Sequence, residues 1–339
     1  MKLISIPVLL VACMISFACS SKQNSQTPEG RAAAQPEGSF NSDSAYSYVA
    51  AQVAFGPRVP GSASHLACAD YIVGKLHQFG ADTVLIQQGT VEGFDGTRMP
   101  LRNILAQFNT AATKRILLAA HYDTRPWADQ DPDSENHTRP IPGANDGGSG
   151  VGVLLEIARN LQLRAPQVGV DFFFIDCEDS GSHDAIDDSR SWCLGSQYWS
   201  HNPVPYTEGH LPVYGILLDM VGAPDAQFPY EYFSQIDGIT PTIRVWSEAE
   251  RLGYSETFPR RVGGAITDDH LYLINAGIPT TDVVECGNPV TGNFPTTWHT
   301  MDDNMDNISR HTLDRVGNTV LSTVYRETPG QNTNTANLQ

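Results

Sequence analysis

Three acidic residues follow a run of apolar residues in the segment DFFFIDCEDSG, residues 171–181. The run of Phe and Ile is typical of a buried strand, and Asp176, Glu178 and Asp179 come at its end. Carboxylates at the edge of a hydrophobic core are costly unless they are paired, hydrogen-bonded or bound to a metal. Because Glu178 and Asp179 are neighbours at a strand end, one can bind a metal while the other faces a reacting group. Asp176 is expected to shape the strand end.

Polar residues also accompany the other apolar runs. His121 follows the run 115–120, Asp219 follows the run 215–218, and Asp146 precedes the glycine-rich start of a predicted helix. In open sheets with parallel strands, ligands bind beyond the carboxyl ends of the strands. We therefore expect these side chains to meet at one edge of a sheet, which favours a shared site over scattered surface charges.

Carboxylates and imidazoles without thiolates suit zinc or another borderline divalent metal. A catalytic zinc needs three protein ligands and an open position. Asp146, one acid of the pair 178–179, and His299 in TTWHTMDDN would supply these ligands. The structural alternative is that Asp146 only caps the helix that follows it. Asp302 and Asp303 are expected to be surface acids.

Helical and strand patterns alternate along the chain from Asp43 onward. Helical spacing of apolar residues predicts helices at 44–55, 65–80, 147–163, 240–253, 268–276 and 309–326. Apolar runs predict strands at 81–88, 115–123, 168–176, 215–222 and 278–286. The alternation predicts an α/β fold with one globular domain over residues 43–328, built on a central, mostly parallel, twisted sheet with helices on both faces.

The charge balance excludes two classes of partner. The chain has 339 residues, with 21 Lys and Arg against 38 Asp and Glu, which gives a formal net charge of -17. An acidic surface of this kind repels nucleic acid and anionic lipid headgroups, so neither is an expected partner. We expect a monomer.

The first residues are typical of a targeting sequence. Residues 1–18 have one Lys, an apolar run and small residues near the end, as expected of a signal peptide. The segment Ser16 to Cys19 resembles a bacterial lipoprotein box, which makes Cys19 the predicted lipidation site; the alternative is a plain secretory signal. Residues 19–42 are predicted to be a polar tether and residues 329–339 a disordered tail.

Both interpretations export the protein. We expect a periplasmic protein of the bacterial envelope that contacts the membrane only through its lipid anchor. Four cysteines remain in the body of the chain, and their pairing is left open, free thiols included: Cys68, Cys177, Cys193 and Cys286.

Several motifs resemble those of the zinc-dependent peptidase M28 clan from about Asp43 to Val324. The motifs shared with the whole clan are GPRVPGS (56–62), HYD (121–123), GANDGGSGV (143–151), the acidic pair at 178–179 and LLDMVG (217–222). Three others are similar to the glutaminyl cyclase branch: GAP directly after LLDMV, ITDDH (266–270) and WHTMDDN (298–304). The resemblance covers most of the mature chain and implies the zinc aminopeptidase-like fold.

The resemblance also implies a role for each matching residue. The implied zinc ligands are Asp146, Asp179 and His299; the implied catalytic residues are Glu178 as general acid/base, with Asp219 and Asp268 as carboxylates that hold hydrogen bonds; the implied substrate walls are Trp298 and Trp192. One zinc ion is expected, and a second ion on His121 and Asp219 only if the protein is a peptidase.

Two positions depart from the family pattern. The second acid of the pair is Asp179, whereas Glu is usual there, so we expect the backbone to lie closer to the metal. The animal cyclases have a His after Gly-Val-Pro, and the matching segment GIPTTD has Asp282, whose role the sequence leaves unassigned.

The activity that the resemblance implies is that of a zinc-dependent glutaminyl-peptide cyclotransferase. Such an enzyme converts the N-terminal Gln of peptides or proteins to pyroglutamate and releases ammonia. The alternative is an M28-type aminopeptidase with two metal ions. A third possibility is a catalytically inactive binding lipoprotein, but Glu178 and the implied metal ligands are all present, which disfavours it.

Overall fold

A single sheet with the strand order β1-β2-β4-β3-β5-β6 forms the centre of the described part of the protein. The computed structural model describes residues 39–182, 190–207 and 209–329. Within these ranges the strands are β1 (Thr83–Glu92), β2 (Arg98–Phe108), β3 (Arg115–His121), β4 (Gly169–Ile175), β5 (Gly215–Leu218) and β6 (Thr280–Val283). Strands β4, β3, β5 and β6 are parallel, whereas β2 is antiparallel to both of its neighbours, β1 and β4. The predicted mostly parallel sheet is confirmed.

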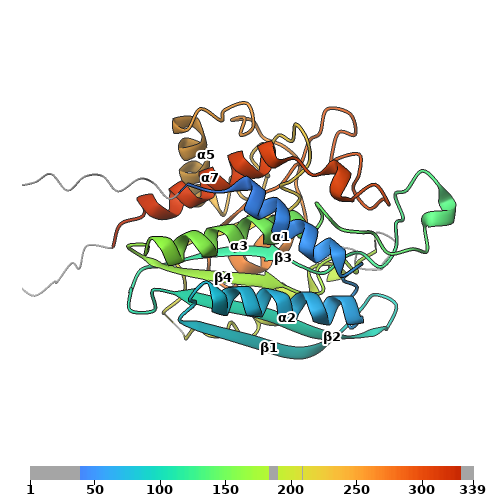
Figure 1. The fold of residues 1–339 in the computed structure, drawn as a ribbon, viewed down its shortest axis with the longest axis horizontal. Coiled ribbons are helices and arrows are strands. Elements are labelled where there is room, and N and C mark those ends of the chain that lie inside the picture. The colour runs from blue at the N-terminus through green and yellow to red at the C-terminus, as the bar shows by residue number, and fades with distance from the viewer. Residues whose placement is uncertain (1–38, 183–189, 208, 330–339) are drawn as a thin grey trace, which may run out of the picture. The chain divides into compact units, whose positions relative to one another are not determined.

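Helices cover both faces of the sheet. One face carries α1 (Ser42–Ala54), α2 (Ala63–Gln78), α3 (Gly148–Leu163), α5 (Ile239–Arg251) and α7 (Arg310–Arg326), and the other carries α4 (Leu194–Ser200) and α6 (Asp269–Asn275). Figure 1 shows α1, α3 and α7 packed together on their side of the sheet. Short 3-10 helices occur at η1 (Ser134–Asn136) and η3 (Met305–Asn307).

The apolar run of β4 explains how one strand serves two cores. Phe172 and Phe174 pack into the larger core, and Phe173 and Ile175 pack into the smaller core beneath α4 and α6. Successive side chains of a strand point to opposite faces, so a strand covered on both faces must be apolar at nearly every position. This is why residues 171–175 lack the alternating pattern of a half-exposed strand.

Besides the two short 3-10 helices, one strand and one α-helix were not predicted from the sequence. Strand β2 contains Pro100 as well as Arg98 and Arg102, so its pattern resembles a loop as much as a strand. Helix α4 spans only seven residues, which is too short for helical spacing to be recognised. The predicted signal peptide 1–18, most of the tether 19–42 and the tail beyond residue 329 lie outside the described residues.

Candidate functional site

The carboxyl ends of three neighbouring parallel strands carry the predicted site residues. His121 is the last residue of β3, Glu178 and Asp179 follow β4, and Asp219 follows β5. Asp146 reaches the same edge from the loop before α3. Strand direction alone therefore collects these groups, as the sequence predicted.

The predicted metal ligands lie close together. His299 Nε2 is 3.2 Å from Asp179 Oδ1 and 3.6 Å from Asp146 Oδ2. One ligand atom from each of the three residues lies within 4.8 Å of the others, and all three side chains are buried. Asp179 Oδ2 is buried without a hydrogen-bond partner. A buried acceptor in this state is costly without a cation or a donor, so two carboxylates and an imidazole at these distances fit a zinc ion.

Backbone hydrogen bonds fix the residues that carry these ligands. The Asp123 carboxylate accepts hydrogen bonds from the amides of Glu178 (3.0 Å) and Asp179 (3.2 Å). The Asp303 carboxylate accepts from the amides of Asn145 (2.7 Å) and Asp146 (3.0 Å). The expectation that Asp303 is a surface acid is therefore wrong, because it is 1% exposed and holds the ligand loop.

The helix-cap alternative for Asp146 is also resolved. Helix α3 has Gly147 at its N-cap, and no side chain makes a capping hydrogen bond there. Gly147 has a φ of +81°, and a Cβ at this position would lie 2.6 Å from the carbonyl oxygen of Asp123. Glycine is needed for this turn, and the turn directs Asp146 toward the ligand cluster and not toward the helix backbone.

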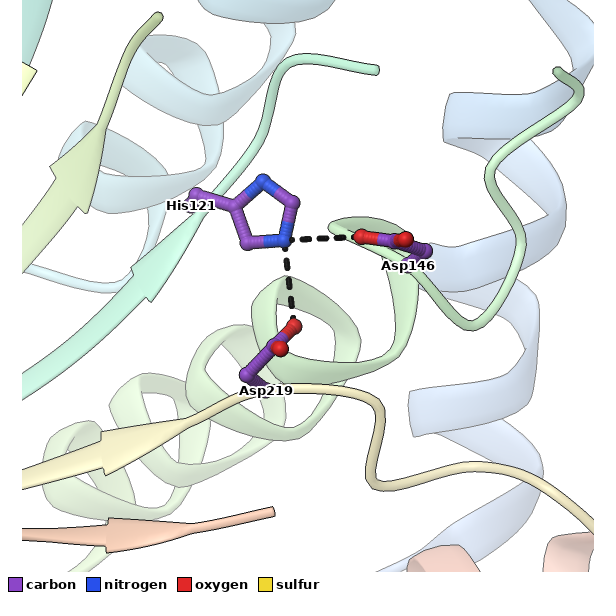
Figure 2. Close-up of side chains that lie close together, drawn as sticks. All are labelled: His121, Asp146 and Asp219. Carbon is purple, nitrogen blue, oxygen red and sulfur yellow. Dashed lines mark hydrogen bonds and ion pairs between the residues drawn. The ribbon is translucent and has the colours of Figure 1, made fainter. Parts of the chain in front are cut away.

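A second cluster shares Asp146 with the first. His121 Nε2 lies 3.2 Å from Asp146 Oδ1 and 3.1 Å from Asp219 Oδ1 (Figure 2). Asp146 thus directs one carboxylate oxygen toward His121 and the other toward His299. A two-metal peptidase would hold its second ion with these residues. The ligand types alone therefore do not distinguish such a peptidase from the cyclase that the sequence motifs resemble.

All eight residues predicted for catalysis, substrate walls and metal binding line one pocket of about 210 Å³. The ring of His299 stacks with two tryptophans, its centroid lying 3.7 Å from that of Trp298 and 6.0 Å from that of Trp192, at interplanar angles of 25° and 17°. Ile266 and Phe294 add apolar surface to the same pocket. The acids therefore lie beside flat aromatic walls that can orient a small substrate.

Glu178, the predicted general acid/base, has a raised pKa in this pocket. Burial raises its pKa well above the usual value; the charge of His121 opposes the shift and the charges of Asp179 and Asp268 add to it. Burial, with the charge of Asp219, raises the pKa of Asp268 to about 6. Two carboxyl groups with raised pKa values at one pocket can accept and return protons near neutral pH.

The cysteine question left open by the sequence is answered by the structure. Among the described residues the four cysteines are buried free thiols. The Cys193 thiol lies 3.4 Å from Glu178 Oε1, to which it donates. Burial raises the pKa of Cys193 well above the usual thiol value, so it is held as a neutral hydrogen-bond donor to the acid.

Asp282 does not line the pocket and lies in a buried row of ionisable side chains. His270 Nδ1 is 3.6 Å from Asp282 Oδ2, and His270 Nε2 is 3.1 Å from Glu231 Oε2. Of the cyclase-like motif ITDDH, Asp268 lines the pocket, whereas His270 is fully buried and does not line it. Asp176 has a structural role, since it accepts from the Arg102 amide and lies 2.8 Å from His65 Nε2.

Comparison with known proteins shows the family. The model of peptidase family M28 matches residues 103–324. The glutaminyl cyclase of Bacteroides thetaiotaomicron, solved with N-acetylhistamine, is 48% identical; the match covers 86% of this chain and 99% of that one, with a TM-score of 0.82. A Zn-dependent exopeptidase from Parabacteroides distasonis is 47% identical, with coverage of 85% and 99% and a TM-score of 0.81. Glutaminyl-peptide cyclotransferase of Bos taurus is 26% identical over 76% of this chain and 75% of its own length. With its strand-end acids and this extent of similarity, the chain belongs to peptidase family M28.

Proposed function

We infer that the protein is a glutaminyl-peptide cyclotransferase, which closes the N-terminal Gln of a peptide or protein into pyroglutamate and releases ammonia. The observation that carries this inference is the placement of Asp268 beside Glu178, in the pocket that also contains the Asp146, Asp179 and His299 cluster. Cyclisation needs a proton taken from the amine and a proton given to the leaving nitrogen. Two adjacent carboxyl groups with raised pKa values suit this exchange.

The reaction joins two atoms of one residue. The α-amino nitrogen attacks the γ-amide carbon, the new C–N bond closes a five-membered ring, and the bond to the amide nitrogen breaks to release ammonia. Glu178 takes the proton from the amine and returns one to the departing nitrogen. Trp298 and Trp192 hold the side chain folded, which supplies the orientation that an intramolecular attack requires. Asp219 and Asp268 hold hydrogen bonds to Glu178 or to the amide nitrogen.

We propose one zinc ion, held by Asp146, Asp179 and His299. When bound, zinc acts as a Lewis acid that polarises the γ-carbonyl group. Asp179 replaces the longer Glu that is usual at this position, and its two oxygens provide the required donors: Oδ1 faces His299 and Oδ2 is unpartnered.

A two-metal aminopeptidase is the second candidate function. The observation that favours it is the cluster of His121, Asp146 and Asp219, whose ligand atoms lie within 4.8 Å of one another. In that enzyme Glu178 would activate water for attack on the first peptide bond. The third possibility, an inactive binding lipoprotein, has no feature of the site in its favour, because Glu178 and all three proposed zinc ligands are in place.

Mass spectrometry of a peptide that begins Gln-Ala tests these alternatives directly. The purified protein lacking residues 1–19 is incubated with the peptide, with and without a chelator. Loss of ammonia with every residue retained, abolished by the chelator, is the expected result. Release of free Gln would establish the aminopeptidase instead, and the absence of both products would favour the binding protein.

We also propose that the protein is a monomer, exported to the periplasm and anchored through lipid on Cys19. Cys19 lies outside the described residues, so the proposal rests on the sequence. Among the residues that the structure describes, no helix is both long enough and apolar enough to cross a bilayer. Replacing Cys19 with Ser and following the protein in detergent phase separation tests the anchor; an unchanged partition would reject it.

A further inference from the structure

Arg125 is a buried cation next to the proposed zinc ligands, and the reaction outlined above does not use it. Its side chain is 1% exposed. The guanidinium donates to both carboxylate oxygens of Asp129, from Nε to Oδ1 at 2.7 Å and from Nη2 to Oδ2 at 2.6 Å. Nη1 lies 3.2 Å from the Gly181 carbonyl oxygen and 3.4 Å from Asp179 Oδ1. Two guanidinium nitrogens, Nε and Nη2, are thus bound to Asp129. The third, Nη1, lies near Asp179, a proposed metal ligand.

Asp129 connects the same guanidinium to the second ligand. Its Oδ1 lies 3.4 Å from Nδ1 of His299, the ring nitrogen opposite the one that faces Asp146 and Asp179. Nδ1 makes no hydrogen bond within the described residues, so the Asp129 carboxylate acts on the imidazole through its charge, and a carboxylate beside the second nitrogen of a ligating histidine favours one ring orientation and one tautomer.

The segment after Arg125 also holds the backbone of His299. His299 has a φ of +56°, a left-handed conformation that is strained for a non-glycine residue. Such a conformation persists only where its surroundings hold it. The Gln130 amide donates to the His299 carbonyl oxygen at 3.2 Å, and Asp131 accepts from the Met301 amide at 2.8 Å. The segment 125–131 therefore contacts His299 at both side chain and backbone.

Arg125 further contacts an aromatic wall of the pocket. Its guanidinium carbon lies 4.8 Å from the ring centroid of Trp192 and 5.0 Å from that of Trp127. Trp192 in turn stacks on His299. A guanidinium can stack on aromatic rings and bind a carboxylate in bidentate fashion at the same time, whereas an ammonium cannot reproduce both contacts.

We propose that Arg125 is a positioning residue that joins Asp179, His299 and Trp192 into one rigid unit and so sets both zinc affinity and the shape of the Gln pocket. The metal part of this proposal concerns the ligand cluster alone, and its kinetic part rests on the proposed cyclase function. Loss of Arg125 would leave Asp129 uncompensated beside His299 and free Trp192 to move. Both changes act on groups that touch metal or substrate.

Arg125→Met and Arg125→Lys test the proposal, with Arg115→Met as a matched control. Arg115 is likewise buried and bound to both oxygens of one carboxylate, that of Asp171. It is the first residue of β3, however, whereas the site residue His121 is the last. Zinc affinity is measured by competition with a chromophoric chelator, without substrate. We expect Arg125→Met to weaken zinc binding about 10- to 100-fold and Arg115→Met to leave it within about threefold. We expect Arg125→Lys to remain weakened, because it keeps the charge without the fork.

A second variant protects the test against misfolding. Asp129 is partly exposed, at 31% of its side chain, so Asp129→Asn removes the link to His299 with little change in packing. This variant is also expected to weaken zinc binding. In the double variant, the total loss of zinc affinity should be smaller than the sum of the losses in Asp129→Asn and Arg125→Met. Wild-type zinc affinity in the folded Arg125 variants, or in Asp129→Asn if they do not fold, would overturn the proposal.

The kinetic readout separates this proposal from the proposed function. If the wild-type protein cyclises Gln peptides, zinc-saturated Arg125→Met is expected to raise KM for the peptide through Trp192, while zinc-saturated Arg115→Met keeps it unchanged. An unchanged KM in Arg125→Met would remove the pocket part of the proposal. If the wild type does not cyclise, weakened zinc binding in Arg125→Met still supports the metal part, whereas the function fails.

Discussion

His121 Nε2 lies 3.1 Å from Asp219 Oδ1, at the ends of the adjacent parallel strands β3 and β5 (Figure 2). The two side chains are close enough to hydrogen-bond to each other, and Asp146 approaches the same nitrogen at 3.2 Å. In the proposed one-zinc cyclase, this contact orients the carboxylate of Asp219, which is one of the proposed catalytic acids. In a two-metal peptidase the same pair would hold the second ion.

Metal content after His121→Ala distinguishes these two uses of the pair. We expect one zinc per chain in the wild type and one in the variant, because His121 does not belong to the Asp146, Asp179 and His299 cluster. Elemental analysis by mass spectrometry after dialysis gives the stoichiometry. Two zinc ions in the wild type and one in the variant would instead support the peptidase.

Glu178→Gln is expected to retain zinc and to lose turnover by a factor of about 10² to 10⁴, the usual contribution of general acid–base catalysis. The amide is close to the carboxyl group in size but cannot accept the proton from the substrate amine. Ammonia release under zinc-saturating conditions gives the rate. Glu250→Gln, at an exposed residue of α5 paired with Arg260, is the control. Near-normal turnover in Glu178→Gln would exclude Glu178 from proton transfer.

Asp146→Ala is expected to lose zinc while the protein remains folded. Asp146 directs its oxygens at both histidines, and it makes no capping hydrogen bond to α3, so its removal affects the metal more than the helix. Asp302→Ala is the control, because Asp302 is exposed although it lies close to His299 in the sequence. Zinc content and far-UV circular dichroism are measured together. Full zinc occupancy in Asp146→Ala would contradict its role as a ligand.

Asp268→Asn is expected to change how stability depends on pH in the zinc-free protein. Burial raises the pKa of Asp268 to about 6 from its ordinary value of 3.8, so the native state binds this proton more tightly than the unfolded state. The resulting stabilisation is complete below about pH 4 and is lost as pH rises through 6, a change of about 2–3 kcal/mol. The variant lacks this contribution.

Urea unfolding at several pH values between 4 and 8 measures the effect. The free energy of unfolding of the wild type is expected to fall relative to that of Asp268→Asn as pH rises across this range. Asn also retains the N-cap of α6, where Asp268 accepts a hydrogen bond from the Asp269 amide, so the comparison isolates the charge. Parallel pH profiles for the two proteins would show that Asp268 titrates normally.

Most of the sheet and its active edge could be predicted from the sequence, because both depend on local patterns. The runs at 115–121 and 169–175 are apolar at nearly every position, which indicates strands buried on both faces, and strand direction then places His121 and Glu178 at one edge. Strand β2 was not predicted because Pro100 and its charged neighbours interrupt the apolar pattern of a strand. Its register depends on pairing with β1 and β4.

The residues that support the site could not be predicted in this way. Asp303 contacts the amide of Asn145, 158 positions away in the chain, and Arg125 meets Trp192 across two loops. Nothing in the local pattern of WHTMDDN distinguishes the buried Asp303 from the exposed Asp302. Contacts between loops that are far apart in the sequence depend on how those loops pack against each other. The local sequence pattern does not indicate how close in space they lie.

The sequence by itself determined the fold class, the strand-end acids and the types of ligand, since these follow from local periodicity and from recognisable motifs. The tertiary structure decided that the cysteines are free thiols, that Asp303 is a buried support and that Trp192 reaches the pocket. It also placed Asp282 in a buried row with His270 and Glu231. Each of these depends on the side chain that lies opposite, and that neighbour is settled only when separate segments of the chain pack together.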